Sequence, residues 1–152
     1  MRAAHLLSAV AGALTLFVSH AALAADLHAR LDDSTNVPQA WRDRLHGLTD
    51  RAVGFAREVA ARADHEAEAR RATSLLYHVA SAVALAWEAG RIHEMRGDAR
   101  RLLLSRMVID HRLAANDPFQ LTEHAQQREM TEHLLGERAV GMAEVGELLV
   151  AA

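Results

Sequence analysis

Cysteine and lysine are both missing from this sequence of 152 residues, in which all 17 basic residues are arginine. The lack of cysteine excludes disulfides, iron–sulfur clusters, thiolate zinc sites and a cysteine nucleophile. The lack of lysine excludes a Schiff-base lysine and the lysine of a phosphate-binding loop. Several large classes of enzyme are therefore ruled out before any motif is considered.

Proline and aromatic residues are scarce: proline occurs only at Pro38 and Pro118, and aromatic residues make up 4% of the chain. Hydrophobic types make up 51% and charged types 24%, which is typical of a folded domain. A length of 152 residues suits one domain, and the abundant alanine favours helix. The formal net charge of −3 gives no reason to expect a nucleic-acid partner.

Apolar residues recur at helical spacing and predict an all-α fold, an antiparallel bundle of four or five helices. A domain over residues 37–150 is expected to contain most of them, with no strand and no transmembrane segment. Residues 72–92 are apolar over most of a helix circumference, so we expect this helix at the centre of the bundle. The predicted helices of the domain are 38–62, 72–92, 99–114 and 119–149.

Glycine and proline mark the breaks between these helices. Gly97 is placed to end one helix in the left-handed conformation, and Asp98 is placed to cap the next, so the two helices should pack antiparallel. Asn116-Asp117-Pro118 marks another stop. Gly136, Gly141 and Gly146 are expected to break or kink the last helix.

The N-terminal residues allow two interpretations. Arg2, an uncharged run over 6–18 and the Ala22-Leu23-Ala24 sequence before Ala25 are typical of a cleaved signal peptide over 1–24. Alternatively, residues 1–31 form a permanent apolar helix, because the helical stripe continues in phase past Ala25 to Leu27 and Leu31. The first interpretation predicts an exported protein, and the second predicts a helix packed in the core.

Ten histidines raise the question of a metal site, but no motif supports one. His65-Glu66 and His93-Glu94 begin like the zincin motif, yet Ala69 and Gly97 stand where its second histidine belongs. The remaining carboxylate–histidine grouping on one helical turn consists of Glu129, Glu132 and His133. A di-iron bundle needs two complete Glu-x-x-His motifs, which this sequence lacks, so we expect no metal.

Other polar and soft residues also favour structural roles. His78 is a candidate axial ligand or proton carrier on an apolar helix, but a core or interface histidine is the simpler interpretation. Met95, Met107, Met130 and Met142 are expected to fill gaps in the core. Arg100 and Arg101 follow the Asp98 cap, where they could bind an anion or form part of a solvated face.

Residues 74–118 combine an apolar Leu-Tyr-His…Ala-Trp-Glu-Ala-Gly-Arg helix, a Gly-Asp-Ala-Arg-Arg hinge and an Arg-Leu-Leu-Leu…Asp-His-Arg-Leu helix ending at Asp117-Pro118. This pattern resembles the C-terminal helical region of bacterial flavin-dependent acyl-CoA dehydrogenases, particularly the longer members with an extra helical extension. Residues 37–44 and the helix after them fit such an extension. The resemblance covers about residues 37–120 and includes no diagnostic catalytic signature.

The resemblance implies FAD, an acyl-CoA thioester substrate, and a carboxylate base that removes the α-proton while the flavin accepts the β-hydride. This sequence departs from the family, because it has no Tyr-Glu-Gly-Thr-like loop to carry the catalytic glutamate. It also shows no match to the family's N-terminal helical domain or middle β-domain. Catalytic and cofactor-binding residues therefore remain unknown, and no residue role is carried over from the family.

Two functions follow as expectations. The first is an acyl-CoA-dehydrogenase-like C-terminal helical domain, an incomplete or detached part of an FAD-dependent oxidoreductase of fatty acid metabolism. It would be cytoplasmic, would not bind FAD alone, and would pair with itself or with the missing dehydrogenase domains. The second is an exported periplasmic helical bundle that binds a partner or a metal through its histidines. Whether the chain is an enzyme stays open.

Overall fold

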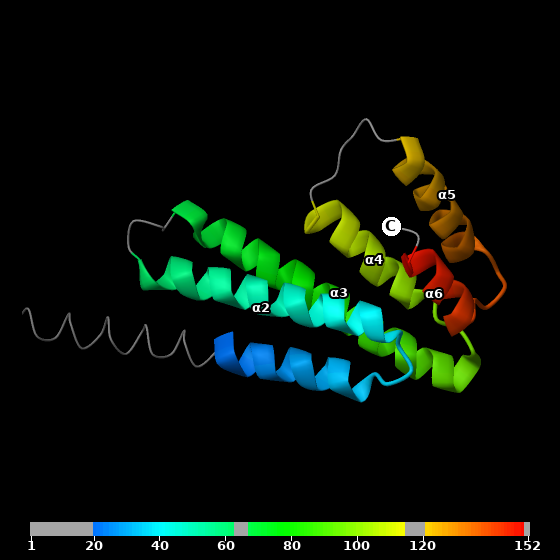
Figure 1. Ribbon diagram of the computed structural model, residues 1–152, viewed down its shortest axis with the longest axis horizontal. Coiled ribbons are helices and arrows are strands. Elements are labelled where there is room, and N and C mark those ends of the chain that lie inside the picture. Colours follow the sequence, from blue (N-terminus) through cyan, green and yellow to red (C-terminus); the bar gives the residue numbers. More distant parts are fainter. Residues whose placement is uncertain (1–19, 63–66, 115–120, 151–152) are drawn as a thin grey trace, which may run out of the picture.

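Helices form all the regular structure in the computed structural model, which describes residues 20–62, 67–114 and 121–150 (Figure 1). An N-terminal helical segment covers 20–33, and α2 (Gln39–Ala61), α3 (Ala69–Arg96) and α4 (Arg101–Arg112) follow it. The chain continues through α5 (Leu121–Leu135) and α6 (Met142–Val150). The predicted all-α bundle is confirmed over these ranges.

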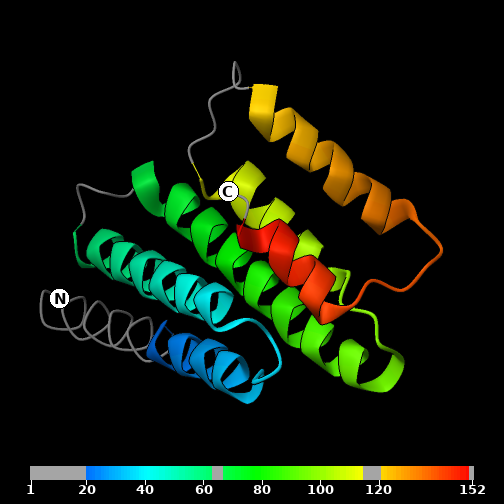
Figure 2. The same cartoon turned by 45° about the vertical axis from the view of Figure 1, so that its right-hand side comes forward.

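The segment 20–33, α2, α3 and α4 run in alternating directions, and α3 lies between α2 and α4 (Figures 1 and 2). This central position fits its sequence, since α3 buries a broad face that includes Val79, Ala82, Val83, Ala86 and Ala89. Small alanine side chains allow neighbouring helices to approach α3 closely. No helix in the described ranges is long and apolar enough to cross a lipid bilayer.

Helix α2 contributes an apolar stripe that follows the predicted spacing. Trp41 and Leu45 are almost completely buried, with 3% and 0% of their surface exposed, and Ala52 continues the stripe. Burial of one such large side chain contributes about 1.5–3 kcal/mol to folding. The helix begins directly after Pro38, whose fixed φ of −51° suits the entry to a helix.

The segment 20–33 is part of the same core. Leu27 and Leu31 are 4% and 0% exposed and belong to the main cluster of buried residues. The helix is continuous through Ala24 and Ala25, the point at which a signal peptidase would cut. The apolar run over 6–18 lies outside the described residues. Cleavage at Ala25 remains a prediction, and it would cut inside this helix.

The turn after this segment is attached to α3 by polar contacts. Asp33 accepts hydrogen bonds from Arg91, at 2.5 Å, and from the indole nitrogen of Trp87, at 3.3 Å. The guanidinium groups of Arg30 and Arg91 lie 5.2 Å and 5.5 Å from the centre of the Trp87 ring, within range of a cation–π interaction. These contacts hold the end of the segment against α3.

A close backbone approach accompanies these contacts. Asn36 donates a hydrogen bond to the carbonyl oxygen of Gly90 at 2.9 Å. A Cβ atom at Gly90 would lie 2.5 Å from the Asn36 Oδ1 atom. Glycine at this position of α3 therefore lets the turn after the segment come near the helix backbone.

The turn between α3 and α4 agrees with the sequence prediction at Gly97. The prediction of Asp98 as N-cap is wrong, because α4 begins at Arg101 with Arg100 in the N-cap position. Gly97 adopts a left-handed φ of 70° and donates its N–H to the carbonyl oxygen of His93 at 2.8 Å. The Asp98 carboxylate accepts the backbone N–H of Arg100 at 3.0 Å and also its guanidinium group at 2.7 Å. Arg100 thereby holds the pKa of Asp98 below its usual value.

Two glycine substitutions should have opposite effects on stability. Gly97→Ala places a Cβ in the left-handed conformation, so we expect the free energy of unfolding to fall by about 1–2 kcal/mol. Gly54→Ala lies inside α2 with no atom within 4 Å of the added Cβ, so we expect a gain of about 0.4–1 kcal/mol. Urea denaturation measures both. Equal effects of the two substitutions would contradict this description of the turn.

The prediction of a single last helix over 119–149 is wrong. Residues 136–141 are not helical, and they separate α5 from α6. Gly136 and Gly141 mark this break, whereas Gly146 lies inside α6. The break lets α6 return to α4, where the backbone N–H of Ala99 donates to the carbonyl oxygen of Val140 at 2.8 Å.

Buried Arg106 connects α4 to both C-terminal helices. Its side chain is 4% exposed, and its Nε atom donates to Asp110 at 3.1 Å. The same guanidinium group donates to the carbonyl oxygen of Leu148 in α6 and to Gln126 in α5. Arg106 therefore links α4 to α5 and α6. These several partners compensate for the burial of its charge.

Candidate functional site

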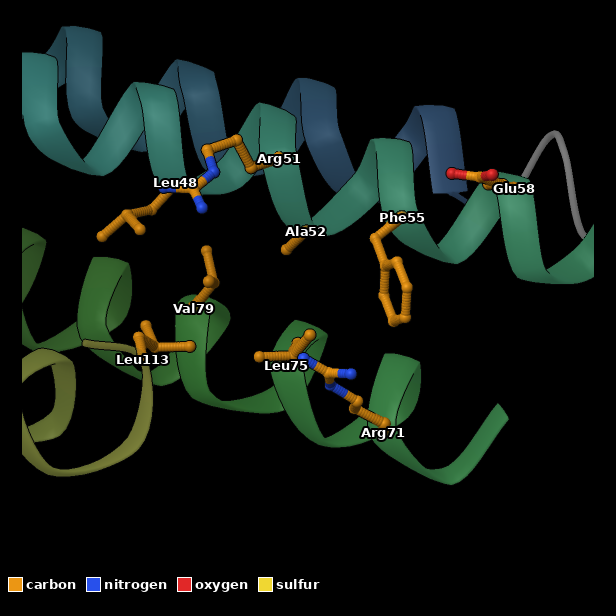
Figure 3. A pocket seen from close by; sticks show the side chains of 9 residues that line it. All are labelled: Leu48, Arg51, Ala52, Phe55, Glu58, Arg71, Leu75, Val79 and Leu113. Carbon is orange, nitrogen blue, oxygen red and sulfur yellow. The ribbon is translucent and has the colours of Figure 1, made fainter. Parts of the chain in front are cut away.

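A groove lined by apolar and charged side chains lies between α2 and α3 (Figure 3). Leu48, Ala52 and Phe55 line it from α2, and Leu75 and Val79 face them from α3. Leu113, at the end of α4, lies beside Val79 at one end. The groove has a volume of about 400 Å³, which falls within the usual range for sites that bind small molecules.

The lining arises from two amphipathic helices that meet only partly. Ala52 and Val79 are buried and form the floor, whereas Leu48, Phe55 and Leu75 are half-buried because no helix covers them. Figure 3 shows the Phe55 ring pointing from α2 towards α3. A half-buried phenylalanine and leucine pair offers apolar surface that a ligand could still remove from water.

Charged side chains stand at the edge of this apolar surface. Arg51 and Glu58 come from α2, and Arg71 comes from α3. The Arg71 guanidinium lies 5.6 Å from the centre of the Phe55 ring, and its Nη1 atom lies 3.6 Å from a Glu68 oxygen. Arg71 therefore covers one side of the phenylalanine while keeping its charge exposed.

A second hollow adjoins the groove and has a volume of about 660 Å³. Arg71, Leu75 and Leu113 line both hollows, so the two form one continuous depression. Arg70 and Arg112 add two further cations to the second hollow. The depression thus has an apolar centre with arginines distributed around it.

The balance of charge around this depression is positive. Among the described residues, no carboxylate pairs with Arg51, Arg70 or Arg112, although many other arginines of the chain have such a partner. The lining carboxylate, Glu58, has an oxygen 4.0 Å from Arg62, outside the groove. Among the described residues these three arginines have no carboxylate partner, and beside an apolar floor they would attract an anionic ligand that has an apolar part.

The lining offers binding groups but no evident catalytic set. It contains no histidine, and its one carboxylate is exposed and lies beside Arg62. Ser74 is a hydroxyl residue of the second hollow, and among the described residues no histidine lines that hollow to act as its base. We therefore interpret the depression as a binding site and assign no catalytic residue to it.

The histidine and carboxylate candidates from the sequence lie elsewhere. Glu129 and Glu132 are exposed on α5, while the His133 Nδ1 atom lies 3.5 Å from Glu144 in α6. Arg138 also contacts Glu144 and holds the pKa of this carboxyl below its usual value. In the described ranges no group of three or more such side chains converges on a point where a metal ion could sit.

The remaining candidates have structural partners or exposed positions. His78 is half-buried and packs edge-on against Tyr77, with 5.3 Å between ring centres. Arg100 contacts Asp98 and the carbonyl oxygen of Gly136, and Arg101 pairs with Glu88, so neither guanidinium is free for an anion.

The methionines divide in the same way. Met130 is 1% exposed in the core, and Met107 and Met142 pack against it as partly buried residues. The prediction of a core position is wrong for Met95, which is 71% exposed.

The apolar residues of the depression lie on predicted helical stripes, and this pattern alone favours a position in the core. Leu48, Ala52 and Phe55 follow the helical stripe of α2, and periodicity does not reveal where a stripe extends beyond its partner helix. A usable signal was present in the arginines that flank the stripe on both helices. Scans against protein-family models, curated proteins and solved structures find no match to this chain.

Proposed function

We propose that the chain is an acyl-CoA-dehydrogenase-like C-terminal helical domain that binds an acyl thioester or a similar amphipathic anion but does not oxidise it alone. One observation carries the proposal: the depression formed by α2, α3 and the end of α4 joins apolar surface to arginines that have no carboxylate partner among the described residues. An acyl chain would lie against Phe55 and Leu75. The phosphates of a CoA group would lie near Arg51, Arg70 and Arg112.

The resemblance of residues 74–118 supplies the second support. Its hinge sequence Gly-Asp-Ala-Arg-Arg coincides with the turn between α3 and α4, and its two apolar helices coincide with these helices. The catalytic glutamate loop of the family has no counterpart in the sequence. We therefore expect the purified chain to lack flavin absorbance, with the missing dehydrogenase domains or another copy of the chain as its partner.

Calorimetric titration of the full chain with octanoyl-CoA tests the binding step. We expect saturable binding that is weaker for free CoA, because CoA lacks the part that covers Phe55 and Leu75. The double variant Arg51→Ala/Arg112→Ala should bind octanoyl-CoA at least about tenfold more weakly, since loss of even one charged hydrogen bond typically costs about 1.5–3 kcal/mol. Both side chains are exposed or at the surface, so the fold should persist.

A matched control distinguishes binding of octanoyl-CoA at the depression from nonspecific attraction of its phosphates to surface arginines. Arg96→Ala/Arg128→Ala removes two exposed arginines that lie outside the depression and lack a carboxylate partner among the described residues. This variant should keep the affinity for octanoyl-CoA. An equal loss in both double variants, or equal affinities for CoA and octanoyl-CoA, would contradict the proposed binding mode.

One observation supports the alternative hypothesis of an exported periplasmic helical bundle. Two histidines from different helices face each other at the surface, away from the depression. N-terminal sequencing of the protein recovered from its host distinguishes the hypotheses, because export predicts a mature terminus at Ala25. An intact Met1 would support the dehydrogenase-like domain.

A further inference from the structure

His28 and His46 form a pair that joins the segment 20–33 to α2. Their Nδ1 atoms are 2.5 Å apart. The two rings are nearly parallel, with an angle of 10° between their planes and 4.8 Å between their centres. The 4.8 Å between the ring centres equals the 2.5 Å between the Nδ1 atoms plus about one ring radius for each ring. The two rings thus lie end to end. The two Nδ1 atoms therefore point at each other.

The outer nitrogen of each ring contacts a carboxylate. His28 Nε2 lies 2.9 Å from an Asp50 oxygen, and His46 Nε2 lies 3.3 Å from an Asp32 oxygen. An ionised carboxylate only accepts hydrogen bonds, so the His28 Nε2 atom that bonds to Asp50 carries a proton. His46 has the matching tautomer when its Nε2 atom donates to Asp32. In a neutral imidazole the other nitrogen then holds a lone pair. Two lone pairs consequently face each other between the rings.

An electron-pair acceptor between the two Nδ1 atoms would relieve this repulsion. A proton and a metal ion are the two candidates. Metal-bound histidines typically coordinate through one nitrogen and donate the N–H of the other to a carboxylate. Both histidines of this pair have that arrangement, with Asp50 and Asp32 in the outer positions. Two such histidines on neighbouring helices favour a metal ion over an isolated structural contact.

We propose that His28 and His46 form a two-histidine site for a divalent transition-metal ion of the Zn²⁺ class. Imidazole nitrogen suits Zn²⁺, Cu²⁺ and Ni²⁺. A Zn–N distance of about 2.0–2.1 Å places two ligands of a tetrahedral ion about 3.3 Å apart. The Nδ1 atoms must therefore separate by less than about 1 Å, and the side chains have room to move because they are 28% and 27% exposed.

Binding exchanges one cation for another. When the pair shares a proton, the metal ion takes its place between the Nδ1 atoms and the proton leaves to solvent. The other coordination positions remain for water or an added ligand, because no third such side chain converges there in the described ranges. The ion would bridge the segment 20–33 to α2, so it should stabilise the packing of this segment.

Titration of the full chain with ZnCl₂ tests the site, with calorimetry in two buffers of different ionisation enthalpy to count released protons. We expect one site, release of any proton that the pair shares, and a rise in melting temperature with Zn²⁺. His28→Gln and His46→Gln should each weaken binding by at least about tenfold, and Asp50→Asn should weaken it by about 10–100-fold. His111→Gln, at an exposed histidine of α4, should leave binding unchanged.

Nitrogen-15 NMR provides a readout that does not depend on variant stability. Bound Zn²⁺ should shift the Nδ1 resonances of His28 and His46 and leave their Nε2 atoms protonated. Zn²⁺ affinity that His28→Gln leaves unchanged would overturn the proposal. So would a pair that shares a proton and shows no Nδ1 shift with Zn²⁺, because the site would then hold a proton only.

Discussion

Replacement of Leu31 by alanine should lower the free energy of unfolding by about 2–5 kcal/mol, the usual cost of a large cavity in a packed core. Leu31 lies at the end of the segment 20–33 and is 0% exposed, in the same buried cluster as residues of α2, α3 and α4. Chemical denaturation monitored by circular dichroism measures the change. The result tests whether this segment contributes to the cooperative core.

The matched control is Leu135→Ala, which removes the same atoms from a leucine that is 80% exposed. This variant should change the unfolding free energy by no more than about 0.5 kcal/mol. A Leu31→Ala protein as stable as the Leu135→Ala protein would show that the segment contributes little to the core. The hypothesis that the N-terminal residues are removed would then gain support.

Asp110→Ala should destabilise the protein by about 3 kcal/mol, because it leaves the buried Arg106 cation without its carboxylate. Arg106 donates to Asp110 at 3.1 Å, and the two side chains are 4% and 19% exposed. The remaining partners of Arg106 are neutral oxygens of Leu148 and Gln126, which cannot balance its charge. The same denaturation experiment measures the loss.

The Asp26–Arg30 pair provides a control with the same spacing. Its nitrogen and oxygen atoms are 2.8 Å apart, but the Asp26 and Arg30 side chains are 57% and 38% exposed, well above those of Asp110 and Arg106. Solvent screens such a pair, so Asp26→Ala should leave stability unchanged within error. Similar losses from Asp26→Ala and Asp110→Ala would mean that burial of Arg106 does not determine the cost.

Helix positions were largely predictable from local sequence. The stripe of Trp41, Leu45 and Ala52 identified α2, and the Gly97-Asp98 pair located the turn before α4. These features depend on residues three or four positions apart or on a single backbone conformation. The break between α5 and α6 was harder to place, because glycine weakens a helix without always ending it. Tertiary contacts, including that of Ala99 with Val140, accompany the break.

The candidate sites could not be predicted from the sequence, because they depend on distances between helices that helical periodicity does not specify. The pair of His28 and His46 joins two helices whose relative rotation the sequence does not specify, so neither histidine was singled out. Phe55 and Leu75 belonged to predicted apolar stripes, but their partial exposure depends on how α2, α3 and the end of α4 pack around the groove. Sequence pattern therefore predicted which faces are apolar, and the packing determined which parts of those faces remain open.

The contacts of Trp87 have a practical consequence for spectroscopy. The chain has two tryptophans, and Trp41 is only 3% exposed. The Trp87 indole instead lies beside Arg30 and Asp33, at the end of the segment 20–33. Detachment of that segment would change the emission of Trp87 before Trp41 reached water. The two fluorophores would thus report separately on the first helix and on the interior.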